Sequence, residues 1–146
     1  FCMIRRFLAA SLLSLFCLAL LLLPQLLDCR PLFPGADSYL FYARAASSQA
    51  VILSAAAEDA SRVKAALADR TGESAFYAHA EDAFAQADRY GARLLFTERA
   101  GDVINYYYSA PSLGGGVLLE GRAVNLHIAV RGGGAAIGTP IIFGGY

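Results

Sequence analysis

The sequence has few charged side chains and no excess of either sign. Charged residues make up 16% of the 146 residues, with 12 basic and 12 acidic side chains, whereas about 25% is usual for a soluble domain. Electrostatic binding to nucleic acid requires a basic surface that displaces counterions, so we expect no nucleic-acid partner. The length also argues against a two-domain enzyme, because one domain takes about 100–150 residues.

Cysteine and histidine are scarce, which excludes several kinds of chemistry. Cys2, Cys17 and Cys29 all lie at the start of the chain, so the residues that follow cannot use a disulfide or a cysteine nucleophile. The two histidines, His79 and His127, have no second histidine or cysteine at metal-ligand spacing. We therefore expect no metal and no cofactor, and we assign no catalytic residue.

Apolar side chains are concentrated in the first 29 residues. Residues 7–27 contain no charge, and a helix of that length would reach roughly 30 Å, enough to cross a bilayer. Cleaved secretory signals have shorter apolar regions followed closely by a small-x-small site. We therefore interpret residues 1–29 as a membrane anchor, with a cleaved signal as the alternative.

Basic residues on the two sides of the apolar run predict its orientation. Arg5 and Arg6 precede the run, and Arg30 follows it. The positive-inside rule then places the N-terminus in the cytoplasm. We expect a single-pass cell-membrane protein whose C-terminal domain lies outside the cytoplasm.

The rest of the chain predicts a short stalk and one domain. Residues 30–38 contain two prolines and a glycine, which disfavour helix and indicate a stalk. Residues 39–146 alternate strands and helices at first and then contain only strands, which predicts an α+β domain with a mainly antiparallel sheet and two helices packed on one face. Helices are expected at 58–70 and 81–90, and strands at 39–43, 49–54, 73–78, 93–97, 103–109, 117–119, 123–131 and 135–143.

Glycine and proline predict where some of these elements end. Gly72 and Gly91 follow the two expected helices, where a left-handed residue commonly stops a helix. Pro140 lies inside the last expected strand and cannot donate a ladder hydrogen bond, so it predicts an edge strand or a bulge.

Two segments near the C-terminus resemble a known family. Asn125, Leu126, Ile128, Ala129 and Arg131 match its Asn-Leu-x-Ile-Ala-Leu-Arg strand, and residues 137–141 (Ile-Gly-Thr-Pro-Ile) match its Val-Gly-Thr-Pro-Ile strand. On these residues the chain resembles the YwmB family of envelope-associated proteins of Gram-positive, often spore-forming bacteria. The resemblance implies a fold like that of the TATA-binding protein and an envelope location, and it implies no reaction.

One expected strand places polar side chains in a row. Strand alternation directs Leu126, Ile128 and Val130 to the core and leaves Asn125, His127 and Arg131 on the opposite face. Such a row could bind a polar or anionic ligand. The alternative is that it forms the solvated face of an antiparallel sheet.

A run of tyrosines occupies another expected strand. Alternation places Asn105, Tyr107 and Ser109 on one face and Tyr106 and Tyr108 on the other. Aromatic rings with hydroxyl groups could form a platform for a sugar or another flat ligand. The alternative is that the tyrosines fill the core and favour the strand conformation.

These features favour a binding protein over an enzyme. We expect a non-enzymatic module that binds an envelope protein or a glycan, through a sheet edge in the strand-rich C-terminal half or through Asn105, Tyr107, Asn125, His127 and Arg131. One alternative is a small cell-wall hydrolase that uses acids such as Glu98 and Asp102. The other is a structural subunit of a larger envelope assembly.

Overall fold

A computed structural model describes residues 2–44 and 50–143 of the chain. The chain forms two compact units, Phe1–Arg30 and Pro31–Tyr146. Gln49, the expected start of the second strand, and residues 144–146 of the expected domain lie outside the described residues.

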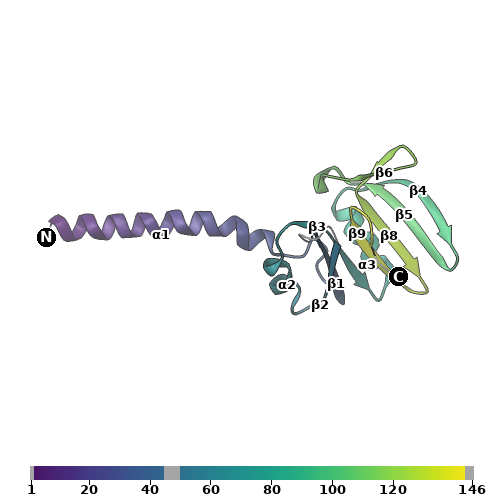
Figure 1. The fold of residues 1–146 in the computed structure, drawn as a ribbon, viewed down its shortest axis with the longest axis horizontal. Coiled ribbons are helices and arrows are strands. Elements are labelled where there is room, and N and C mark those ends of the chain that lie inside the picture. Colours follow the sequence, from purple (N-terminus) through teal and green to yellow (C-terminus); the bar gives the residue numbers. More distant parts are fainter. Residues whose placement is uncertain (1, 45–49, 144–146) are drawn as a thin grey trace. The chain divides into compact units, whose positions relative to one another are not determined.

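The first unit contains the long helix α1, Cys2–Asp28 (Figure 1). Its segment Arg6–Leu23 has a mean hydropathy of 2.3, and none of this segment is buried inside the protein. An 18-residue apolar segment is within the length range that crosses a hydrocarbon core. By length and composition, α1 can therefore span a membrane.

The second unit is built around a mainly antiparallel sheet. In the described residues, seven strands pair in the order β2-β1-β3-β9-β8-β5-β4, and every neighbouring pair is antiparallel (Figure 1). A separate two-stranded hairpin consists of β6, Val117–Leu119, and β7, Arg122–Val124. The strands of the main sheet are β1 (Ser38–Arg44), β2 (Ala50–Ala56), β3 (Arg70–Tyr77), β4 (Arg93–Ala100), β5 (Val103–Ser109), β8 (Leu126–Arg131) and β9 (Gly134–Thr139).

Two short helices pack against this sheet. Helix α2, Ala60–Ala66, contacts β1 and β2, and helix α3, Ala80–Arg89, contacts β3, β8 and β9. Ala83 and Ala87 of α3 are buried, as the predicted apolar stripe requires. The α+β class and the mainly antiparallel sheet are therefore confirmed. A 3-10 turn at Pro111–Leu113 follows β5.

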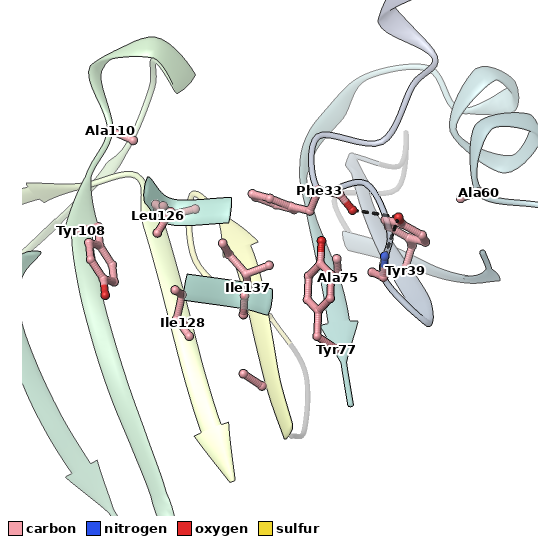
Figure 2. Close-up of a cluster of buried hydrophobic side chains, with 14 of the residues drawn as sticks. Phe33, Tyr39, Ala60, Ala75, Tyr77, Tyr108, Ala110, Leu126, Ile128 and Ile137 are labelled. Atoms are coloured by element: carbon pink, nitrogen blue, oxygen red, sulfur yellow. Dashed lines mark hydrogen bonds between the residues drawn. The ribbon is translucent and has the colours of Figure 1, made fainter. Parts of the chain in front are cut away.

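The core lies between the helices and one face of the sheet (Figure 2). Alternate residues of the central strands supply it, as the pattern of residues 126–130 predicts. We call the opposite sheet face the open face. The large fully buried side chains on the helix side include Phe33, Phe41, Leu126, Ile128 and Ile137.

The segment expected to be a stalk contributes to this core. Phe33 is fully buried and Ala36 is 4% exposed. The hydroxyl of Tyr39 donates to the Phe33 carbonyl oxygen at 2.8 Å, and the hydroxyl of Tyr90 donates to the Leu32 carbonyl oxygen. Residues 32–36 are thus held against the domain by buried aromatic and polar contacts.

A buried ion pair connects α2 to the sheet and was not anticipated from the sequence. Lys64 Nζ lies 2.6 Å from Glu73 Oε2, and the two side chains are only 6% and 5% exposed. The other carboxylate oxygen of Glu73 accepts a hydrogen bond from the Leu32 backbone N–H. One carboxylate therefore joins α2, β3 and the segment 31–33.

The first helix of the domain is shorter than predicted. It ends at Ala66, and β3 already begins at Arg70, because Asp69 adopts a left-handed conformation (φ 49°) and turns the chain. The expected helix stop at Gly72 is therefore wrong. Gly72 lies in β3, where a Cβ atom would come within 2.2 Å of the Thr139 carbonyl oxygen, so this residue permits close approach of β9. Gly91 does end α3, with φ 60°.

The expected strand 123–131 is divided. It breaks at Asn125 into β7 and β8, which belong to different sheets. The last strand is also shorter than expected and ends at Thr139, so Pro140 follows a strand that lies between β3 and β8. The edge position predicted for Pro140 is therefore wrong.

The two edge strands differ in charge. β2 at one edge contains no charged residue, while β4 at the other carries Arg93, Glu98 and Arg99 and a bulge at Leu95. Charges and bulges on an edge oppose pairing with another chain. Strands β8 and β9 are internal, so the edge that the C-terminal half of the chain contributes to the main sheet is β4.

Candidate functional site

Strand pairing brings three aromatic side chains together on the open face. Tyr107 of β5 lies opposite Phe96 of β4 on one side and opposite His127 of β8 on the other. The Phe96 and Tyr107 ring centroids are 4.6 Å apart, and so are those of Tyr107 and His127. Both pairs are stacked, with interplanar angles of 26° and 12°. We call these three residues the aromatic row.

The stacking decides how this row can contact a ligand. Because β5 lies between β4 and β8, the two faces of the Tyr107 ring are covered by Phe96 and His127. A sugar or another flat ligand stacks on ring faces, and Tyr107 offers only its edge and its hydroxyl. The expected stacking platform is therefore not available at Tyr107.

A bulge in β4 makes this row possible. Leu94 pairs with Tyr108, whereas Phe96 pairs with Tyr107, so Leu95 is an extra residue in the strand. An extra residue reverses the alternation of the residues that follow it. The bulge thereby turns Phe96 to the open face, which the sequence pattern alone would not place there.

His127 is held in one uncharged form by its partners. Its Nδ1 accepts a hydrogen bond from the Ile142 backbone N–H at 3.3 Å, so the proton is on Nε2, which donates to Asn105 Oδ1 at 2.9 Å. The side chain is only 8% exposed. Burial lowers the pKa of His127 to about 4, so the ring is neutral at pH 7.

The structure thus brings three of the five predicted site residues together. Asn105, Tyr107 and His127 share the open face and contact one another in pairs. The Tyr107 hydroxyl donates to Glu98 at 3.2 Å, and burial raises the pKa of that hydroxyl with a further contribution from the Glu98 carboxylate.

Asn125 has a local structural partner for each of its side-chain groups. Its Oδ1 accepts from the Ala110 N–H at 2.7 Å, and its Nδ2 donates to the carbonyl oxygens of Ala110 and Gly114. The residue is 6% exposed. These contacts fasten the loop after β5 where the chain passes from β7 to β8, which leaves the side chain little capacity for a ligand.

Arg131 is the last residue of β8, and its side chain is hydrogen-bonded to another residue. Its Nε donates to Asp102 Oδ2 at 2.7 Å, and both side chains are exposed. The guanidinium lowers the pKa of Asp102 below its ordinary value, chiefly through this hydrogen bond. A glycosidase acid needs a raised pKa, so Asp102 does not have the environment of a general acid.

The C-terminal segment covers one half of the open face. The Tyr42 hydroxyl on β1 accepts from the Phe143 backbone N–H at 3.1 Å, and the two rings meet edge to face with centroids 5.2 Å apart. A Cβ atom on Gly138 would lie 2.9 Å from Ile142, so glycine lets the segment approach the sheet closely. This cover contributes to the burial of His127, which accepts a hydrogen bond from the Ile142 backbone N–H on a face that could have been solvated.

A basic hollow adjoins the uncovered half of the open face and was missed from the sequence. It has a volume of about 530 Å³. Arg122 Nη1 donates to the carbonyl oxygen of Leu95, the bulge residue, and the Arg122 guanidinium lies over the Phe96 ring at 5.8 Å from the centroid. We call it the arginine hollow; its lining residues are Arg93, Leu94, Leu95, Ser109, Arg122 and Ala123.

Two sequence signals could have pointed to this hollow. The run Leu94-Leu95-Phe96 interrupts the alternation expected of an edge strand, which is typical of a bulge. The turn Glu120-Gly121 fixes a hairpin and so places Arg122 beside β4, although their proximity requires the tertiary fold.

Neither a metal site in the described residues nor a similarity to a known protein assigns a function to this surface. Within residues 2–44 and 50–143, no group of three or more His, Cys, Asp or Glu side chains is arranged to hold a metal ion. No family model, curated protein or solved structure matches this chain.

Proposed function

We propose that this chain is a membrane-anchored binding module of the cell envelope, with its domain outside the cytoplasm and no catalytic activity. The observation that carries the proposal is the uncovered half of the open face. There Phe96 and Tyr107 of the aromatic row lie beside the arginine hollow, since Arg122 of the hollow rests over Phe96.

The contacts on this surface suit binding better than catalysis. His127 is neutral, and both of its ring nitrogens are hydrogen-bonded. Nε2 donates its proton to Asn105 Oδ1, and Nδ1 accepts from the Ile142 N–H. A general base needs a free nitrogen within reach of the proton that it removes. The contacts favour binding over the hydrolase alternative, because Glu98 accepts a hydrogen bond from Tyr107 and Asp102 is paired with Arg131.

The location outside the cytoplasm rests on α1 and on the sequence around it. The apolar segment Arg6–Leu23 supports a membrane span, and Arg5 and Arg6 before it support a cytoplasmic N-terminus. The resemblance of residues 124–141 to the YwmB family supports an envelope role, and on that resemblance alone we also propose that the role is related to sporulation.

A protein is the partner that this surface favours over a glycan. The Tyr107 ring has no uncovered face for a sugar, while ring edges, Arg122 and Asn105 can meet the side chains of a partner protein. Tyr and Arg are also enriched at protein interfaces.

Site-specific photocrosslinking of the full chain in its native membrane tests this function. A photoreactive phenylalanine replaces Glu98, which lies on the open face beside the aromatic row. We expect a crosslinked protein product from this position. The matched control replaces Arg62 on α2, an exposed residue on the helix side of the domain, and is expected to give no such product. Equal products from both positions, or none from Glu98, would contradict the proposal.

A further inference from the structure

The arginine hollow has the charge and the size of a ligand site. Its volume of about 530 Å³ is within the range of about 300–1,000 Å³ typical of small-molecule pockets. Arg93 and Arg122 are the charged residues among those that line it, and no acidic residue is among them. Two like charges on one hollow repel each other unless an anion lies between them.

The two arginines differ in how they are held. Arg122 is oriented by the Leu95 carbonyl oxygen and by the Phe96 ring. Arg93, in contrast, makes no side-chain hydrogen bond or ion pair with any other residue that the structure describes. One guanidinium is thus positioned in advance, and the other retains its full set of donors for a ligand.

A hydroxyl group and a strand bulge complete the hollow. Ser109 ends β5 directly opposite Arg93 in the strand register and lines the same hollow. The bulge at Leu95 supplies the carbonyl group that holds Arg122, and bulges commonly re-aim side chains next to functional sites. The nearby acid Glu98 on β4 accepts a hydrogen bond from Tyr107.

We propose that the arginine hollow binds an oxyanion, a carboxylate or phosphate group of the ligand, between the guanidinium groups of Arg93 and Arg122. Planar guanidinium forks match both groups through paired hydrogen bonds, and the Ser109 hydroxyl supplies another donor. This inference rests on the proposed binding function, since it names the chemical group that the same surface recognises.

The test is an NMR titration of the full chain in maltoside micelles. Acetate and inorganic phosphate are added separately, with sodium chloride at equal ionic strength as the control for screening. We expect saturable shifts of the Ser109 amide and the Arg122 Nε–H signals with at least one anion. The anion that binds more tightly identifies the source of the oxyanion, a carboxylate or a phosphate.

Substitutions then connect binding to the two arginines. Arg93→Gln and Arg122→Gln are each expected to weaken the anion by about tenfold or more, while Arg122→Lys, which keeps the charge and loses the fork, gives an intermediate loss. Arg99→Gln, on the same strand and outside the hollow, is the matched control and leaves binding unchanged. Signals of Leu126 and Ile128 report that each variant is folded.

Two outcomes would overturn the inference: no saturable shift with either anion, or binding that survives both glutamine substitutions. Photocrosslinking from the Glu98 position is independent of this titration. A crosslink without anion binding removes the oxyanion site and retains the proposed function, and anion binding without a crosslink does the reverse.

Discussion

Two ion pairs of nearly the same length have opposite surroundings in this domain. Lys64 and Glu73 lie 2.6 Å apart with side chains that are 6% and 5% exposed, whereas Arg131 and Asp102 lie 2.7 Å apart with side chains that are 52% and 68% exposed. Water screens the second pair much more than the first. Distance alone therefore says little about what each pair contributes.

The two pairs also stand at different ends of the sheet. Glu73 belongs to β3, in the half where the C-terminal segment covers the open face and α2 covers the other. Asp102 lies in the turn between β4 and β5, at the end that carries the aromatic row. One end is fastened by buried polar contacts, and the other keeps its polar groups at the surface, where a ligand can reach them.

The largest expected effect is at the buried pair. Glu73→Gln keeps an acceptor for the Leu32 N–H but leaves the Lys64 ammonium buried without its counter-charge. Removing one partner of a buried pair costs about 3–5 kcal/mol. We expect a loss of that size in the free energy of unfolding, measured by urea denaturation of the full chain in micelles and followed by circular dichroism.

A double variant is the control for that prediction. Lys64→Met with Glu73→Leu removes both charges together, and apolar replacement of a whole buried pair is often neutral. We expect it to recover most of the stability that Glu73→Gln loses. If the free energy of unfolding of Glu73→Gln lies within about 1 kcal/mol of that of the parent, the buried pair behaves like a surface pair and the prediction is wrong.

The next effect is a pH dependence caused by His127. Its pKa is about 4 in the folded domain and about 6.5 in an unfolded chain, so the unfolded chain binds more protons between these values. Stability is therefore fully present above pH 6.5 and is lost as the pH falls towards 4, by about 3 kcal/mol in total. Urea denaturation between pH 7 and pH 5 measures the slope.

His127→Gln separates this slope from the titration of carboxylates. Glutamine cannot gain a charge in this range, so the variant is expected to show a flatter dependence between pH 7 and pH 5. An unchanged slope in the variant would assign the pH dependence to other groups and contradict the burial of an uncharged ring.

A smaller effect tests the cover over one half of the open face. Tyr42→Phe removes the hydroxyl that accepts from the Phe143 N–H and contacts Ser74 Oγ at 2.8 Å. A buried hydrogen bond contributes about 1 kcal/mol, and we expect a loss of that order with faster hydrogen exchange at the Ile142 and Phe143 amides.

Tyr107→Phe is the matched control on the uncovered half. Its hydroxyl bonds to the exposed Glu98 at 3.2 Å, so its removal is expected to have a smaller effect on stability and none on exchange at Ile142. Equal effects of the two substitutions would show that the halves of the open face do not differ in how tightly they are held.

Local patterns in the sequence predict much of this fold. Residues 103–109 form β5 as expected, because β-favouring side chains run between two turn signals. Helix α3 begins within one residue of its predicted start and ends before Gly91, as its apolar stripe and glycine stop require. Leu126 and Ile128 enter the core by simple alternation.

The features that local patterns miss depend on contacts distant in sequence. The Leu95 bulge turns Phe96 to the open face, and the register with β5 is needed to place the extra residue at Leu95. Sequence position alone suggests that Gly72 ends a helix, whereas in the structure Gly72 lies in β3 and permits the close approach of β9. Among the predicted site residues, His127 keeps its predicted place on the open face, yet burial and its partners change what the ring can do. Asn125 lies at the break between β7 and β8, where its side chain bonds to the Ala110 backbone.

The smallest expected effect is at the exposed pair. Asp102→Asn keeps the shape of the side chain and removes its charge, and exposed pairs contribute little because water and side-chain entropy offset the attraction. We expect no measurable change in Tm. The pair can still be detected by titration, because Arg131 lowers the pKa of the Asp102 carboxyl. In Arg131→Gln, an NMR titration is expected to show that this pKa rises towards its ordinary value. A destabilisation by Asp102→Asn as large as that by Glu73→Gln would show that burial does not separate the two pairs, and the comparison between the fastened and the accessible end of the sheet would then fail.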